Sequence, residues 1–317
     1  MKKISYFGLT MSLILILTGC GQKPADEQVK EGIDKYFALT NYSNALYATL
    51  HLDAPEIEAY GIGTDFYISE QSDFIGDKFR SDVSVELNGL TIDVSAWGTQ
   101  ELFYVDVPFI GSTMVYDSAE IAEYLGKTEE EMKSQSDLQE KLMKDLMAEV
   151  SLKEIFIFDD PLKESITISE KSLNTTKIRA VPNDDNAKMV TEKILNLILD
   201  EGDNLFLTAM ANGEADLESL KEELIKTRDD MVNMTDEDFN ETYLNPAKEI
   251  LTNFEITFYI SDHNIMRTNI EMTLTYEGNA ISLSLNSDLI NIGGVQDFVI
   301  EVPEESYPLT DFLEGYN

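Results

Sequence analysis

The sequence is poor in the residues that most enzymes use for chemistry. It contains one cysteine, Cys20, and two histidines, His51 and His263, among 317 residues. A disulfide cannot form within the chain, so packing alone must stabilise its core. Neither histidine lies in a His-Glu-x-x-His motif, and the chain has no Gly-x-Ser-x-Gly motif and no glycine-rich phosphate loop. These absences remove the usual signatures of zinc proteases, serine hydrolases and nucleotide-binding enzymes, and no cofactor is predicted.

Basic residues are also scarce. The chain has 23 Lys and Arg against 60 Asp and Glu, which gives a formal net charge of −37. A nucleic-acid-binding protein needs clustered basic side chains to neutralise phosphates, and none occur here. We therefore exclude nucleic acid as a partner. The acidity is interpreted mainly as a well-hydrated surface, with attraction of cations as the alternative.

The chain also has no long hydrophobic segment. The longest apolar segment that it does have lies at the N-terminus. It runs from Ile4 to Leu17, follows Lys2 and Lys3, and is interrupted by small and polar residues. A transmembrane helix needs about 20 apolar residues, so this segment is too short to span a bilayer. A short positive start, an apolar run and small residues at its end are typical of a secretory signal peptide.

The four residues Leu17, Thr18, Gly19 and Cys20 resemble the lipobox of bacterial lipoproteins. This resemblance implies that residues 1–19 are a signal peptide and that Cys20 carries a diacylglyceryl thioether and an acylated amino group. Two or more acyl chains, palmitate for example, hold a protein stably on a membrane. We therefore expect a lipid anchor on the extracytoplasmic face of the cell membrane, followed by a polar spacer over residues 20–30. The alternative is that Cys20 is a buried thiol.

The first half of the chain predicts one helix followed by strands. Helical spacing of apolar residues predicts a helix over residues 25–39, and alternation of period two predicts strands from residue 42 to residue 107. The clearest local signal is Asn88-Gly89 between two alternating segments, because this pair adopts the positive φ angles of a two-residue hairpin turn. We expect His51 on the polar face of its strand.

The second half alternates between helices and strands. Helices are predicted over residues 118–126 and 128–150, from residue 183 through Leu197, around residues 217–224, and from Thr235 toward Leu251, with Pro246 kinking or splitting the last. Strands are predicted around residues 154–158, 165–169 and 175–181. Three alternating segments from Phe254 to Leu285 predict an antiparallel meander, with His263 in a turn, and a last strand is predicted over Val299–Val302.

Together these patterns predict an α+β fold. We expect one curved antiparallel sheet of about 10 to 11 strands, a half-barrel, in a single domain over residues 31–317. Each predicted strand has one apolar face, so the sheet should be covered on one side only. The amphipathic helices are the available cover and should pack on its concave face.

This arrangement, with its N-terminal lipobox, resembles the LolA/LolB and LppX/LprG superfamily of lipoproteins and lipoprotein carriers, and in particular lipoprotein families of Gram-positive bacteria with that fold. The resemblance rests on architecture over nearly the whole mature chain. It implies a hydrophobic cavity between sheet and helices that binds lipids or acylated molecules without catalysis. The methionines in and near the predicted helices are an adaptable lining for such a surface, although ordinary core packing is the favoured explanation for them. The candidates for the cavity lining are Phe254, Ile256, Phe258, Ile270, Met272, Leu274, Ile281, Leu283, Met143 and Met147.

Two other functions stay open. The first is an envelope lipoprotein with a filled core that has a structural or protein-interaction role and no small ligand. The second is a hydrolase that uses two carboxylates, for which the acidic groups are candidates, although none has the spacing of a calcium loop. These groups are Asp159-Asp160, Asp184-Asp185, Asp229-Asp230 and the segment 200–204.

Overall fold

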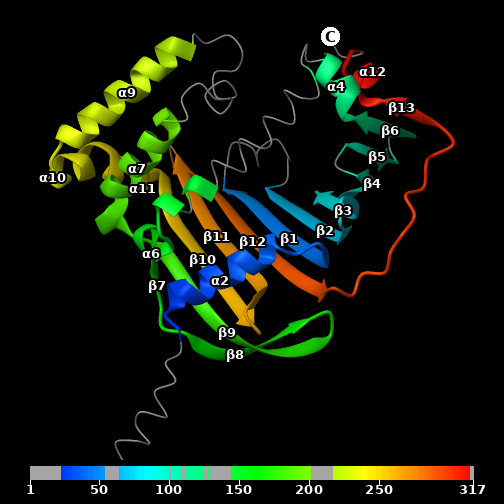
Figure 1. Ribbon diagram of the computed structural model, residues 1–317, viewed down its shortest axis with the longest axis horizontal. Helices are drawn as coiled ribbons and strands as arrows, with labels where there is room; N and C mark the ends of the chain where they lie inside the picture. The colour runs from blue at the N-terminus through cyan, green and yellow to red at the C-terminus, as the bar shows by residue number, and fades with distance from the viewer. Residues whose placement is uncertain are drawn as a thin grey trace, which may run out of the picture.

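The protein folds around one large curved sheet. The computed structural model describes residues 23–53, 64–99, 101–108, 111–124, 128, 144–146, 148–200, 217–276 and 278–314. These residues form an α+β structure with an open sheet of 13 strands (Figure 1). The strand order is β13-β6-β5-β4-β3-β2-β1-β12-β11-β10-β9-β7, and β8 pairs with β9. The predicted fold class is confirmed as α+β with a large curved sheet, which has more strands than we expected.

The strands form two antiparallel runs. The first run comprises β1 (Asn41–Asp53), β2 (Asp65–Ile75), β3 (Lys78–Leu87), β4 (Leu90–Thr99), β5 (Leu102–Val107) and β6 (Ser112–Asp117). The second comprises β7 (Phe156–Phe158), β8 (Leu162–Ile168), β9 (Lys171–Pro182), β10 (Leu251–Ser261), β11 (Asn264–Tyr276) and β12 (Asn279–Ile292). β1 pairs with both β2 and β12, so it joins the two runs into one sheet.

Two tight hairpin turns match their sequences. Asn88 and Gly89 have φ angles of 56° and 74°, as the Asn-Gly pair predicts for the β3–β4 hairpin. Asp262 and His263, with φ angles of 48° and 65°, make a similar turn between β10 and β11. These turns fix the register of the strands that they connect.

The C-terminal part of the sheet differs from the prediction. Val299–Val302 is not a strand: it belongs to an extended connection over residues 293–305, in which Val299 is 85% exposed and no neighbouring strand pairs with the backbone. Trp97 Nε1 donates a hydrogen bond to the carbonyl of Glu301, 2.7 Å away, so side chains hold this connection instead. It leads to β13 (Ser306–Pro308), which pairs parallel to β6. The sheet is therefore mixed, not wholly antiparallel.

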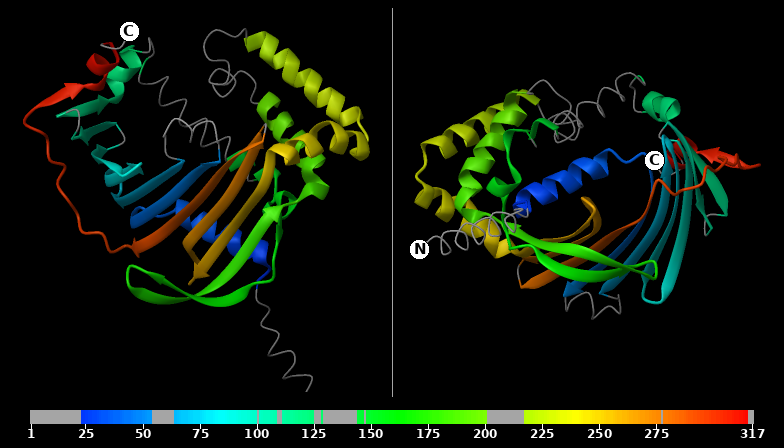
Figure 2. Two further views of the ribbon diagram at one scale, coloured as in Figure 1. Left: turned by 180° about the vertical axis from the view of Figure 1, so that it is seen from behind. Right: turned by 60° about the horizontal axis from the view of Figure 1, so that its bottom comes forward.

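The N-terminal helix α2 (Ala25–Phe37) lies inside the curve of the sheet (Figure 2). Val29 is buried against strand residues that include Ile178, Phe258 and Ile265, and Ile33 packs beside it. Because the helix begins at Ala25, it takes up most of the predicted polar spacer. The short helix α6 (Leu152–Ile155) adds Leu152 to the same core.

A second group of helices has a small core of its own. Leu195, Met231 and Phe239 are buried together in it, and α11 also contacts β10 and β11. A π-helical turn precedes Pro246, so the last predicted helix is interrupted as expected. The group comprises the 3-10 turn η1 (Asp184–Asn186), α7 (Ala187–Asp200), α9 (Leu217–Asn233), α10 (Asp236–Phe239), the π-helical turn η2 (Asn240–Leu244) and α11 (Asn245–Ile250).

Two short helices complete the described structure. α4 (Ser118–Tyr124) and α12 (Leu309–Glu314) pack on each other and on β6. The backbone N–H of Ala119 donates to Asp117 Oδ1, so the Asp117 side chain caps the start of α4. The helix predicted over residues 128–150 lies mostly outside the described residues. None of the helices that the structure describes is long and apolar enough to cross a membrane.

The sheet is not covered on one side only. The β8–β9 hairpin folds against the face opposite α2, where Ile166 and Ile168 are buried with Tyr259. The alternation of the strands did not reveal this second core, because it is built from a few residues at one end of the sheet. Over most of β1–β4 the face opposite α2 is polar.

Candidate ligand-binding cavity

Strand pairing collects apolar side chains on the face of the sheet that contacts α2, which we call the inner face. Directly opposed residues of antiparallel strands point to the same face. One such row runs through Ala180, Ile256, Ile270, Leu285 and Ala48. The row continues across the first run of strands through Ile68, Val85 and Ile92. The inner face is thus apolar across both runs of strands.

The pairing places the eight strand candidates on this inner face. Phe254, Met272 and Leu283 form a row parallel to the one described above, and Leu274 is opposite Ile281. The remaining candidates are Ile256, Phe258 and Ile270, which also occupy inner-face positions. The two helix candidates, Met143 and Met147, lie outside the described residues.

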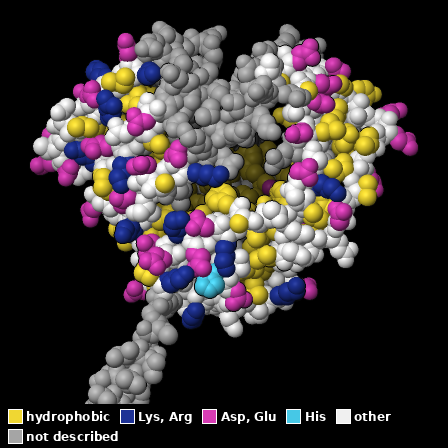
Figure 3. Space-filling model, in the orientation of Figure 1, with side chains coloured by type: hydrophobic (Ala, Val, Ile, Leu, Met, Phe, Trp, Pro, Cys, Tyr) yellow, Lys and Arg dark blue, Asp and Glu magenta, His cyan; other side chains and the backbone are white. Residues whose placement is uncertain are grey.

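A cavity of about 380 Å³ lies between α2 and the inner face. Phe258 and Ile270 line it, while the other six strand candidates continue the apolar face beyond it. Figure 3 shows hydrophobic side chains in a hollow at the centre of the molecule. Sequence reasoning missed the further lining residues because they come from α2 and β1 or flank the meander candidates. They include Ile33, Tyr36, Phe37, Leu46, Leu285 and Leu289.

A few polar groups interrupt the apolar lining. Ser287 Oγ donates a hydrogen bond to Asn44 Oδ1 over 3.2 Å, and both residues line the cavity. The phenol groups of Tyr36 and Tyr42 are hydrogen bonded to each other, and burial raises the pKa of both, that of Tyr42 to about 12. Both phenols are therefore neutral at physiological pH, and Tyr36 is the one of the two that lines the cavity.

A polar cluster fastens the N-terminal half of α2 to the β10–β11 turn. Glu31 lies 2.7 Å from Lys23 Nζ and 3.0 Å from His263 Nδ1. The hydrogen bond that Glu31 accepts from Lys23, together with the one that it accepts from His263, lowers the pKa of Glu31. His263 is exposed, as its turn position predicts, but it also contacts the helix. His51 lies on the polar outer face, 2.8 Å from Asp65, as expected.

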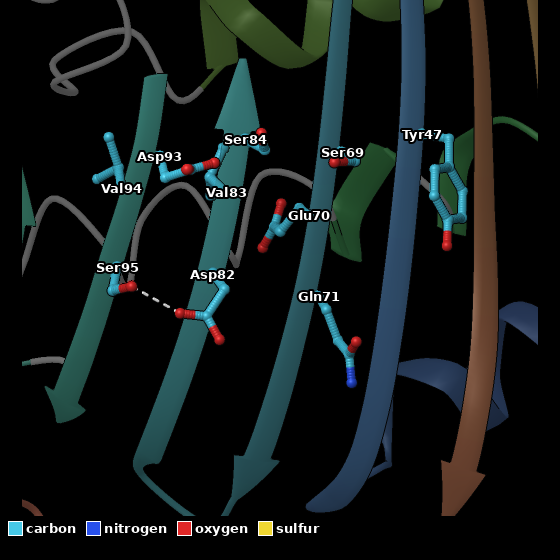
Figure 4. Close-up of a pocket in the computed structure, with 10 residues that line it drawn as sticks. All are labelled: Tyr47, Ser69, Glu70, Gln71, Asp82, Val83, Ser84, Asp93, Val94 and Ser95. Atoms are coloured by element: carbon cyan, nitrogen blue, oxygen red, sulfur yellow. Dashed lines mark hydrogen bonds between the residues drawn. The ribbon is translucent and has the colours of Figure 1, made fainter. Parts of the chain in front are cut away.

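A second pocket, of about 400 Å³, lies on the outer face over β1–β4. Figure 4 shows its lining, in which Ser95 Oγ donates a hydrogen bond to Asp82 Oδ1 over 2.6 Å. Hydroxyl and carboxylate groups such as those of Ser84 and Asp93 dominate this pocket, and Tyr47 stands at one side. In the described ranges, no three His, Cys, Asp or Glu side chains are placed to hold a metal ion.

The acidic pairs proposed for a hydrolase lie on different elements. Asp159 is 3.6 Å from Arg179, Asp184 pairs with Lys248, and Asp229 is 2.7 Å from Arg228. Each of these carboxylates thus faces a cation near the surface. Of the segment 200–204, only Asp200 is described.

In comparisons with known proteins, no family model and no curated protein matches this chain. The predicted signal peptide, with Leu17, Thr18, Gly19 and the lipid attachment at Cys20, lies outside the described residues. A function must therefore be argued from the fold and the cavity.

Proposed function

We propose that this protein is a membrane-anchored extracytoplasmic lipoprotein that binds or shuttles a lipid or other hydrophobic ligand, without catalysing a reaction. The observation that carries the proposal is the continuous apolar inner face with its cavity beneath α2. A volume of about 380 Å³ lies in the range of small-molecule sites, which are mostly apolar with a few polar groups.

The inner face is only half-buried, which favours a ligand over a filled core. Many of its side chains keep contact with solvent, and Leu90 and Ile281 are 64% and 40% exposed. Soluble proteins seldom leave a contiguous apolar surface of this kind uncovered unless it binds something. A bound acyl chain would cover these residues and gain the free energy of apolar burial.

In this proposal the curved sheet is a half-barrel that holds the ligand on its concave face. We infer that α2 and the helical group from α7 to α11 form its cover on the concave face, as the resemblance to the LolA/LolB and LppX/LprG superfamily implies. The packing of Val29 and Ile33 on β10 and β11 supports this for α2. Cleavage before Cys20 and its lipidation would hold the half-barrel at the membrane, where lipids are available.

Native mass spectrometry of the full chain, released from detergent in the gas phase, tests this proposal. We expect a stoichiometric lipid mass in addition to the covalent anchor, and extraction of the bound lipid identifies its class. A protein with its anchor but no further lipid, unchanged after incubation with membrane lipids, would contradict ligand binding.

One observation favours the alternative, a structural or interaction lipoprotein. The connection over residues 293–305 exposes Val299 and Val302 to 85% and 72%, and Tyr307 of β13 follows. Exposed apolar side chains on an extended segment suit a protein partner. Crosslinking in cells that captures one stoichiometric protein partner, together with the absence of bound lipid, would establish this function.

A further inference from the structure

One charged residue stands out on the inner face of the described strands. Across the described strands β1–β6 and β10–β12, the pairing registers assign every Lys, Arg and Asp, and every Glu except Glu70, to the outer face. Glu70 stands between two apolar residues, opposite Leu46 on one side and Val83 on the other. A lone carboxylate on an apolar face is costly unless it interacts with something.

Glu70 is one of the residues that line the outer-face pocket, and its register position also places it next to the lining of the inner-face cavity. Its direct neighbour Leu46 lines the cavity, and its charge contributes to the raised pKa of Tyr36 on α2, which lines the cavity as well. The apolar floor of the cavity on β10–β12 therefore adjoins polar groups near β1 and β2, namely Glu70 and the phenols of Tyr36 and Tyr42.

One oxygen of the Glu70 carboxylate is already bonded. Oε1 accepts hydrogen bonds from the hydroxyls of Ser72 and of Ser81, the latter 3.0 Å away. Oε2 has no partner among the residues that the structure describes. The carboxylate is thus held in place by two serines, and its second oxygen is available to a donor.

We propose that Glu70 selects the head group of the ligand: the cavity takes an amphiphile whose head is an amine or a hydroxyl, and it rejects an anionic head such as a phosphate. This inference rests on the proposed function. A hydroxyl or ammonium group donates to Oε2, and a charge-assisted hydrogen bond forms. A phosphate would meet a carboxylate, and the described strands place no Lys or Arg on the inner face to neutralise either group, so burial of both charges is unfavourable.

Photoaffinity labelling of the full chain in membrane vesicles from expressing cells tests this assignment. The probes are three alkyl chains of equal length, each with a diazirine on the chain and an amine, a hydroxyl or a phosphate as head group. Labelled peptides are identified by mass spectrometry, and only those with inner-face residues such as Ile270 and Leu285 are counted. Glu70→Gln removes the charge and keeps the shape, while Glu70→Lys reverses the charge. Glu86→Lys, on the outer face of β3, is the matched control for net charge.

In the wild type we expect the amine and hydroxyl probes to label the inner face about tenfold more than the phosphate probe, the effect of one charge-assisted hydrogen bond. Glu70→Gln should remove the advantage of the amine, and Glu70→Lys should make the phosphate the preferred probe, while Glu86→Lys behaves as the wild type. Equal inner-face labelling by all three probes in every variant would overturn the role of Glu70 and leave the cavity standing. No inner-face labelling by any probe would overturn the proposed ligand binding, and this inference with it.

Discussion

Arg267 and Asp288 form an ion pair with two hydrogen bonds on the outer face, next to the β8–β9 hairpin. Arg267 Nε is 2.5 Å from Asp288 Oδ1 and Nη2 is 2.7 Å from Oδ2, and Nη2 also donates to the carbonyl of Thr167. Asp288 is only 6% exposed. The pair therefore links β11, β12 and the hairpin, and removal of one partner leaves a poorly solvated charge.

We expect Asp288→Ala to lower the free energy of unfolding by about 3 kcal/mol, because it leaves the charge of Arg267 poorly solvated and without a counter-ion. Urea denaturation measures this change. The control is Asp34→Ala, which breaks the exposed pair with Lys30 on α2 and should change stability by less than about 1 kcal/mol. Equal effects of the two substitutions would show that the buried ion pair contributes no more to the free energy of unfolding than the exposed pair does.

Glu154 provides a test by pH. The hydrogen bond from Lys193, followed by the one from the backbone N–H of Ser151, lowers its pKa from the ordinary 4.5 to about 2. A carboxyl group whose pKa is lower in the folded state stabilises the protein above its unfolded pKa, and this contribution disappears as the pH falls to the folded pKa. The relevant window is therefore from pH 4.5 down to about 2.

The substitution Glu154→Gln isolates this contribution from the many other acidic groups. We expect the variant to be less stable than the wild type at pH 7, and the difference between their unfolding midpoints to shrink steadily below pH 4.5. Thermal unfolding followed by circular dichroism at several pH values measures it. A difference that stays constant with pH would contradict the depressed pKa.

Among the elements, α2 depends on a glycine for its close approach to the sheet. A Cβ added at Gly32 would lie 2.6 Å from Cγ1 of Ile265 on β11. We expect Gly32→Ala to lower the free energy of unfolding by about 1 kcal/mol, because overpacking of about 1–3 kcal/mol exceeds the gain in helix propensity of about 1 kcal/mol. Lys30→Ala, at an exposed position of the same helix, should change it little.

A double-mutant cycle identifies the contact as the cause. Ile265→Ala alone removes a buried side chain and destabilises the protein. The combination Gly32→Ala with Ile265→Ala should be more stable than the sum of the two single effects predicts, because the clash disappears. Thermal and urea unfolding of the four proteins give the coupling. If the two changes in the free energy of unfolding were strictly additive, a clash between an added Cβ at position 32 and Ile265 would not be the cause of the destabilisation.

The elements also show what a sequence can reveal. Alternation predicts which side chains of Phe254 to Leu285 share a face, because the period of two is a property of each strand, and the structure confirms the shared face. It does not predict that β1 pairs with β12, since nothing local marks partners from opposite ends of the chain. The parallel pairing of β13 covers three residues, too few for a pattern. The cavity combines residues of α2, β1 and the β10–β12 meander, and no local pattern predicts which residues of such distant segments meet.

At the scale of the whole molecule, the lipid anchor remains a prediction that a substitution can test. If Cys20 carries acyl chains, Cys20→Ala should move the protein from the membrane to the soluble fraction, because the substitution removes the acyl chains that anchor it. Fractionation of expressing cells and incorporation of a clickable fatty acid measure the two consequences. Membrane retention of Cys20→Ala, with no loss of label, would contradict the anchor.

The half-open inner face gives the test that connects fold and function most directly. Leu285 stands between Ile270 and Ala48 in the central apolar row and lines the cavity, whereas the neighbouring Ser284 points to the outer face. Leu285→Trp should fill the cavity and reduce the lipid bound per protein several-fold, because the ligand and the indole compete for one volume. Ser284→Trp adds the same side chain on the opposite face and should leave bound lipid unchanged. Native mass spectrometry gives both occupancies, and circular dichroism confirms that both variants fold. Equal lipid binding by the two variants would show that the lipid does not bind in this cavity. The apolar inner face of the sheet would then have to be explained by contact with something else, such as a protein partner.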